Sequence, residues 1–213
     1  MALADQNLQI PATVDVLGDL ILRGAFRRGW NRSELTQDNL LAYPLETSDW
    51  RVWDSYGTDL GSAASDDLGI GTGTFGTGLP YISAGDLKAA GATTRRARIL
   101  FTLPAEYVAG ETVQIRAAAG MLTTIADTSC TIDFECYKSN RDTTKTGSDL
   151  VTTSATTINS TTFGEKTFAV TSTGLSPGDV LDIRLSIACN DGATGTAVTP
   201  AVAHVEMQLD VKG

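Results

Sequence analysis

Strict alternation of apolar and polar residues marks the C-terminal part of the chain. Apolar side chains occupy every second position in residues 180–189 and again in residues 203–211. A period of two is typical of a strand that turns one face to a core and the other to water or a partner. The two segments therefore predict two long strands at the end of a sheet protein. On the second strand, the polar face carries His204, Glu206, Gln208 and Asp210.

Similar segments recur upstream, and turn-forming residues separate them. Glycine, proline, asparagine and aspartate fill the breaks, where their backbone preferences favour turns. Because no helical pattern lies between consecutive segments, the order predicts an all-β antiparallel β-sandwich of seven or eight strands. The predicted strands are residues 50–53, 97–103, 111–119, 129–137, 149–157, 166–171, 180–189 and 203–211.

The first 45 residues follow a different pattern. Apolar residues recur there at helical spacing, and a cluster of arginines follows them. This predicts two parts, an N-terminal arm with a short helix over residues 1–45 and a sandwich over residues 46–213. Gly18 and Gly24 each cost a helix about 1 kcal/mol, so the arm is expected either to order against a partner or to pack on its own domain. The candidate interface residues are Leu17, Leu20, Ile21, Arg27, Arg28 and Trp30.

The net charge of the chain indicates which classes of partner it can bind. The chain has 25 acidic and 16 basic residues, a formal net charge of −9. A phosphate backbone must be neutralised by lysine and arginine, so direct nucleic-acid binding is not expected. No uninterrupted apolar stretch approaches about 18 residues and the N-terminus lacks the features of a signal peptide, so neither a membrane span nor export is expected.

The three cysteines fall where the alternation points inward. Cys130 and Cys136 lie on one predicted strand, about 20 Å apart at 3.3 Å per residue, which is too far for a disulfide. A bridge from Cys189 to either one stays open. Buried free thiols are the simplest interpretation, and they suit folding in a reducing cytoplasm.

Candidate chemistry is sparse. Residues 71–76 match GxGxxG, but no helix pattern follows, so they predict a loop rather than a dinucleotide site. The single histidine, His204, cannot form a multi-histidine metal site. Asp66, Asp67 and Asp191 lie beside glycine-rich turns and leave a calcium site as a minor alternative. The sequence therefore predicts no catalytic, cofactor-binding or metal-binding residues, and no enzyme.

Aromatic residues concentrate near the N-terminus. Six of the 14 lie before residue 57. Such a group can stack sugars or anchor an interface, and it can equally form a core where arm and sandwich meet. The core role is the favoured interpretation. The six are Phe26, Trp30, Tyr43, Trp50, Trp53 and Tyr56.

Residues 168–187 read FAVTSTGLSPGDVLDIRLSI. This stretch resembles jelly-roll structural proteins of tailed-bacteriophage virions, the capsid decoration (cement) and head-fibre proteins, and the resemblance extends over residues 165–212. It implies a β-jelly roll, often trimeric, that docks on the assembled capsid. The resulting expectation is a homotrimeric virion protein that binds the major capsid protein and stabilises the shell.

Two alternatives from other classes stay open. One is a carbohydrate-binding or receptor-binding module of a phage tail or head fibre, for which aromatic residues should form an exposed row on a sheet face or in the loops. The other is a hydrolase with a carboxylate pair, although the sequence does not place two carboxylates across a cleft.

Overall fold

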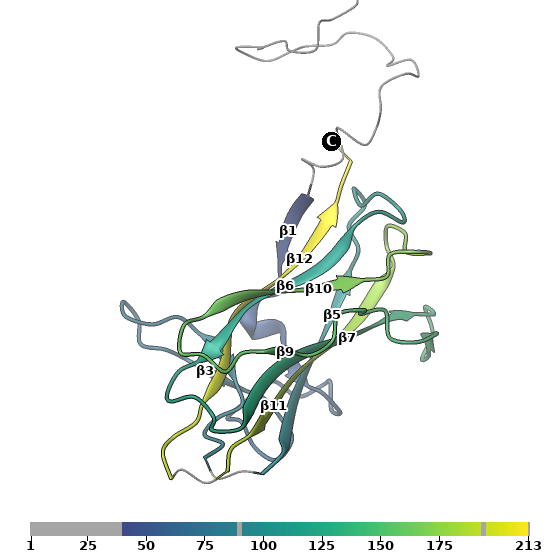
Figure 1. Cartoon of the computed structure of the whole chain (residues 1–213). Coiled ribbons are helices and arrows are strands. Elements are labelled where there is room, and N and C mark those ends of the chain that lie inside the picture. The colour runs from purple at the N-terminus through teal and green to yellow at the C-terminus, as the bar shows by residue number, and fades with distance from the viewer. Residues whose placement is uncertain (1–39, 89–90, 193–194, 213) are drawn as a thin grey trace, which may run out of the picture. The chain divides into compact units, whose positions relative to one another are not determined.

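The computed structural model describes residues 40–88, 91–192 and 195–212, which form two facing antiparallel sheets (Figure 1). Sheet A contains β1 (Leu40–Pro44), β3 (Gly69–Gly71), β4 (Tyr81–Ser83), β6 (Val113–Met121), β10 (Gly164–Val170) and β12 (Pro200–Asp210). Sheet B contains β2 (Arg51–Val52), β5 (Thr93–Thr102), β7 (Ser129–Ser139), β8 (Lys145–Thr146), β9 (Thr156–Thr157) and β11 (Val180–Asn190). A short 3-10 turn, Thr47–Asp49, is the only helical element in this part of the chain.

The strand order is that of a jelly roll. Sheet A runs β10-β6-β12-β4-β3, with β1 also paired to β12, and sheet B runs β2-β5-β11-β7-β8, with β9 paired to β7. From β4 onward the chain crosses between the sheets at each connection, except where β7, β8 and β9 follow one another in sheet B. Two interleaved antiparallel sheets of this kind define the jelly roll, so the all-β sandwich prediction is confirmed.

The eight predicted strands all overlap observed ones, but the structure adds four and shortens two. The additions are β1, β3, β4 and β8. Of residues 50–53 only two form β2, and of residues 149–157 only two form β9. Because β1 pairs with β12, sheet A includes residues from Leu40 onward, inside the range predicted as the arm. The predicted helix and its six interface residues fall outside the described residues and stay predictions.

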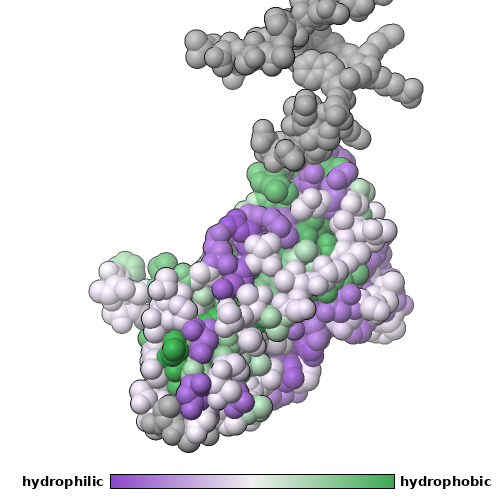
Figure 2. Space-filling view, in the orientation of Figure 1, coloured by the Kyte–Doolittle hydropathy of each residue, from purple (hydrophilic) through white to green (hydrophobic). Residues whose placement is uncertain are grey.

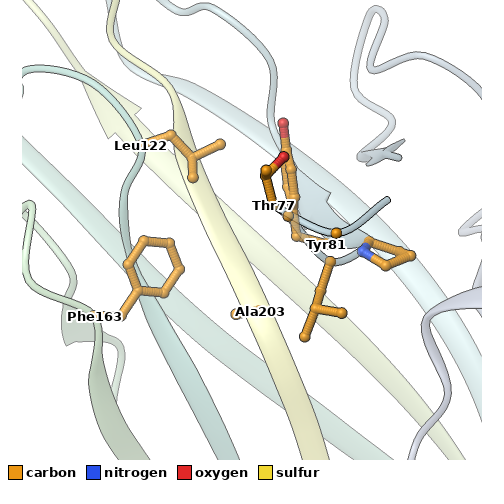
Figure 3. A pocket seen from close by; sticks show the side chains of 9 residues that line it. Thr77, Tyr81, Leu122, Phe163 and Ala203 are labelled. Carbon is orange, nitrogen blue, oxygen red and sulfur yellow. The ribbon is translucent and has the colours of Figure 1, made fainter. Parts of the chain in front are cut away.

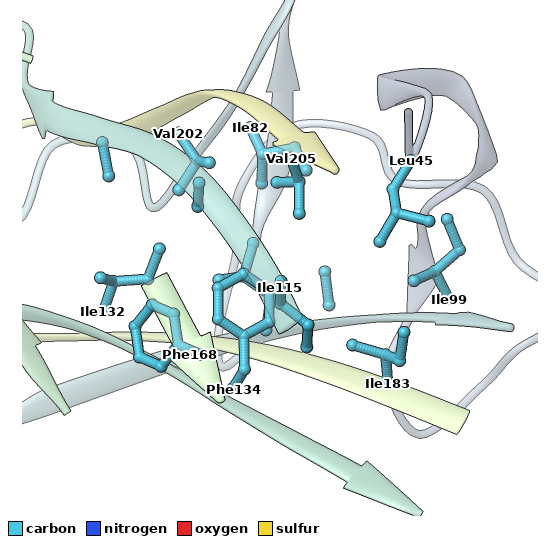
Figure 4. Packing of buried hydrophobic residues seen from close by; sticks show 14 of the residues in the cluster. Leu45, Ile82, Ile99, Ile115, Ile132, Phe134, Phe168, Ile183, Val202 and Val205 are labelled. Carbon is cyan, nitrogen blue, oxygen red and sulfur yellow. The ribbon is translucent and has the colours of Figure 1, made fainter. Parts of the chain in front are cut away.

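The core lies between the two sheets (Figure 4). The ring of Phe134 from sheet B meets that of Phe168 from sheet A edge to face, with centroids 4.9 Å apart. Aliphatic residues such as Ile115 and Ile183 pack around this pair. Burial of apolar side chains stabilises the fold by about 25 cal/mol for each Å² of apolar surface removed from water. This stabilisation explains why apolar residues occupy every second position along the long strands. All three cysteines are buried and free, as predicted.

Candidate functional site

The outer face of sheet B presents a lattice of charged and aromatic side chains. Three adjacent strands, β5, β11 and β7, contribute alternate residues whose neighbours along each strand point into the core. The pairing registers place these outward residues side by side across the sheet. One row contains Arg98, Arg184 and Glu135, and the next contains Leu100, Asp182 and Tyr137.

Two ion pairs cross between the strands of this lattice. Arg98 donates hydrogen bonds of 2.6 Å from Nε and Nη2 to the two carboxylate oxygens of Asp182. The hydrogen bond to Asp182 raises the pKa of the Arg98 guanidinium. Arg184 Nη2 lies 2.5 Å from Glu135 Oε1. The two-point pairing of Arg98 with Asp182 fixes both planar groups, so this part of the sheet face holds donors and acceptors in set directions.

Trp53 covers one side of these ion pairs. Its ring lies 5.3 Å from the guanidinium carbon of Arg96 and 5.6 Å from that of Arg184. The indole Nε1 donates a 3.1 Å hydrogen bond to Asp66 Oδ2. Cation–π contacts and this hydrogen bond therefore hold the indole in place while it stays partly exposed.

Two tyrosines also lie at this face. The Arg98 guanidinium carbon is 5.4 Å from the ring centroid of Tyr56. The Lys145 Nζ is 3.1 Å from the ring centroid of Tyr137. Trp53, Tyr56 and Tyr137 thus bring three aromatic rings to this sheet face, two of them from the segment just after β2 and one from β7.

Two of these rings, Trp53 and Tyr137, line a shallow groove. A depression of about 330 Å³ adjoins one of about 360 Å³, and the two share Arg98, Lys145 and Asp182. Along β11 the groove passes from Arg184 to Val180, about 13 Å at 3.3 Å per residue. The first depression is lined by Trp53, Arg98, Glu135, Tyr137, Lys145, Asp182 and Arg184. The groove can receive a polar ligand with flat apolar faces, because it combines partly exposed rings with donors and acceptors.

The polar row predicted on the last strand belongs to the other sheet. His204 is exposed, with Nε2 3.1 Å from Glu206 Oε2, and Gln208 donates to the same carboxylate. Arg116 of β6 also pairs with Glu206, at 3.3 Å. Asp210 departs from the expectation of a solvent-facing row, because it is buried.

The other candidates separate into structural and surface groups. Trp50 is fully buried in the core, as the favoured interpretation of the aromatic cluster predicts, whereas Trp53 and Tyr56 lie on the sheet face. Gly71 ends β3 and residues 72–76 lie within the β3–β4 connection, as the loop prediction expects. The carboxylate of Asp66 accepts from Trp53, and that of Asp191 accepts from the backbone amide of Asp127. Within the described residues no group of three histidine, cysteine, aspartate or glutamate side chains could hold a metal ion.

The described part of the chain contains no helix that is long and apolar enough to cross a membrane.

Comparisons with known proteins give distant similarities in fold. No family model and no curated protein matches the chain. The xylan-binding domain CBM22-2 of Paenibacillus barcinonensis Xyn10C aligns with 79% of this chain and 98% of its own, at 13% identity and a TM-score of 0.43. The module TmCBM61, in complex with β-1,4-galactotriose, aligns with 76% of this chain and 89% of its own, at 9% identity and a TM-score of 0.42. The Stig cyclase Fisc of Fischerella sp. TAU aligns with 80% of this chain and 90% of its own, at 14% identity and a TM-score of 0.42.

These similar structures include binding modules and a cyclase. One fold carries many functions, so a function for this chain has to be argued from its own residues.

Proposed function

We propose that this jelly roll is a carbohydrate-binding module whose ligand lies in the groove on sheet B. The observation that carries the proposal is the placement of Trp53 and Tyr137 in one groove with the Arg98–Asp182 and Arg184–Glu135 pairs. A sugar ring has an apolar face of C–H groups and a rim of hydroxyls that both donate and accept. Aromatic rings suit the first feature, and fixed guanidinium and carboxylate groups suit the second.

The dimensions and chemistry of the groove favour a chain of sugars over a single small molecule. The groove is open, and its residues follow β11 for about 13 Å, enough for more than one ring. Glu135 and Asp182 are each held by an arginine, so the proposal assigns them to hydroxyl recognition. We therefore propose binding without turnover.

Affinity electrophoresis of the full chain in gels that contain soluble polysaccharides tests this proposal. The expected result is retardation by at least one polysaccharide, with a loss of affinity of about tenfold or more in Trp53→Ala, because ring stacking supplies much of the contact. Leu41→Ala is the control, since Leu41 is an apolar residue of β1 in sheet A that is 50% exposed and lies outside the groove. If no polysaccharide retards the protein, or if both variants lose affinity equally, the proposal is wrong.

A second candidate is the virion decoration role that the resemblance of residues 165–212 implies. It is supported by two adjacent exposed apolar side chains on β1, Leu40 at 41% and Leu41 at 50%, because exposed apolar side chains suit contact with another protein. Under this proposal the chain lies on the capsid and contacts the major capsid protein. Immunogold labelling of purified virions, with an antibody against the sandwich, is expected to mark the head; labelling of tails alone or of no particles would contradict it.

A further inference from the structure

The connection between β3 and β4 presents an aromatic side chain to solvent. Phe75 is fully exposed, at 103%, and Leu79 is 82% exposed. The amides of Thr77 and Gly78 both donate to the carbonyl of Thr74, at 2.9 and 2.8 Å, so the segment forms a defined turn. It contains positive φ angles only at glycines, 64° at Gly73 and 85° at Gly76, where they cause no strain. These hydrogen bonds define the backbone of the turn that carries Phe75, and the loop projects from the left side of the body in Figures 1 and 2.

An apolar pocket of about 540 Å³ lies directly beside this turn (Figure 3). Thr77 and Tyr81 line one side of it, and Leu122 and Phe163 line the other. Ala203 lies between them, where the register of β12 shifts between residues 202 and 204. This irregularity leaves Ala203 exposed, so a small side chain forms the floor.

Two glycines allow the aromatic walls of the pocket to lie close to the sheet. A Cβ on Gly120 would come within 2.9 Å of the Phe163 ring. The Tyr81 ring lies across Gly71 in the same way, where an added Cβ would overlap it. Both rings are thus packed against backbone, and the pocket they line is preformed.

None of the residues that line this pocket is charged, although the whole chain has a net charge of −9. Depletion of charge and enrichment of aromatic residues mark the centres of protein–protein interfaces. An acidic chain repels its own copies elsewhere, so an uncharged surface is the place where two copies can meet.

We propose that this surface joins two copies of the chain, with Phe75 of each copy seated in the pocket of the other. Phe75 immediately precedes Gly76, which lines the pocket, so the Phe75 side chain and the pocket are neighbours on one surface. A two-fold axis between copies requires such a self-complementary patch. The groove on sheet B plays no part in this contact, so the proposal is independent of carbohydrate binding.

Sedimentation-velocity ultracentrifugation of the full chain over a wide concentration range tests the contact. The wild type is expected to dimerise, and Phe75→Ser is expected to raise the dimer dissociation constant at least tenfold, because it removes the seated ring. Since Phe75 makes no contact within its own chain, this variant leaves the fold intact. Ala203→Phe, which fills the pocket from within, is expected to weaken the dimer as well. Leu100→Ser is the control, because Leu100 is 43% exposed on the opposite sheet.

The salt dependence of dimerisation gives a second test of the proposed contact. Raised salt screens the repulsion between two acidic copies and leaves the apolar contact intact, so dimerisation is expected to strengthen. A wild type that stays monomeric at every concentration overturns the proposal. A dimer that Phe75→Ser does not weaken, or that Leu100→Ser weakens equally, overturns it too.

Discussion

Arg98 and Asp182 form a two-point ion pair between β5 and β11, with both hydrogen bonds at 2.6 Å. Both side chains are partly exposed, so solvent screens part of their attraction. A double-mutant cycle with Arg98→Ala and Asp182→Ala is expected to give a coupling of about 1 kcal/mol in the free energy of unfolding. Urea denaturation of the four proteins measures it.

The pair Arg51–Asp59 provides the control for this cycle. Its closest approach is 3.3 Å, and the Asp59 side chain is 84% exposed. A single contact in water is expected to give no measurable coupling. Equal coupling energies in both cycles would show that the two-point geometry of Arg98 and Asp182 does not increase the stability of the fold.

The alternation along the chain predicted the sandwich well because every long strand has one buried face. In β11 and the second half of β12, a slip of one residue would turn the whole apolar set to solvent, so sequence and register agree. The strand β1 was missed because its residues are exposed or half-buried and its last residue is Pro44. The short strands β3 and β4 border a glycine-rich loop. They were missed because a strand of three residues is too short to show an alternation of apolar and polar positions.

The candidate groove was only partly visible in the sequence. Trp53 and Tyr56 belonged to the aromatic cluster, but a core position was favoured for that cluster, and among its four described members Trp50 alone is fully buried. Arg98, Glu135 and Asp182 lie on three strands that are separated by long stretches of chain. Only the pairing register brings them together, and register is fixed by the buried face rather than by these polar residues.

Cys130 and Cys189 lie directly opposite each other on β7 and β11. The interaction between the two thiols raises the pKa of Cys130 and lowers that of Cys189. We expect oxidised glutathione to convert the pair to a disulfide, with two thiol hydrogens leaving as the glutathione disulfide is reduced to two thiols. Peptide mass spectrometry after alkylation in denaturant identifies the bridge.

The third thiol is the internal control for this oxidation. Cys136 faces Ile183 across β11, so it has no cysteine opposite it. Burial raises the pKa of Cys136 to about 12, which disfavours the reactive thiolate. The Cys136→Ser variant is expected to form the same bridge as the wild type, and Cys189→Ser to form none. A disulfide that includes Cys136 would contradict the assignment.

Asp179 is expected to stabilise the fold above acidic pH. Burial alone would raise its pKa, but hydrogen bonds from Lys138 and the Ser176 amide, with the charges of Lys138 and Arg141, hold the pKa below its usual 3.8. A lowered folded-state pKa gives stability that is present above 3.8 and is lost as pH falls through the folded value. Asp179→Asn is expected to cost about 1–2 kcal/mol at pH 7. Urea titrations at several pH values should show that this difference shrinks below pH 3.8.

For Asp210 we expect the opposite effect of pH on the stability of the fold. Its side chain is buried, and Oδ1 has no hydrogen-bond partner among the described residues. Burial, with the nearby charge of Glu111, raises its pKa above the usual 3.8. A raised folded-state pKa gives stability that is present below 3.8 and is lost as pH rises through the folded value, so the charged form weakens the fold at neutral pH.

The neutral isostere Asp210→Asn is therefore expected to raise the free energy of unfolding at pH 7 by about 1 kcal/mol. Below pH 3.8 the carboxyl is protonated in both the folded and unfolded states, so wild type and variant are expected to converge. The same urea titrations measure both aspartates, and the two variants should deviate from the wild type in opposite directions at pH 7. A loss of stability in Asp210→Asn at neutral pH would contradict this prediction. It would mean that the charged carboxylate makes a favourable interaction that outweighs the free-energy cost of its burial.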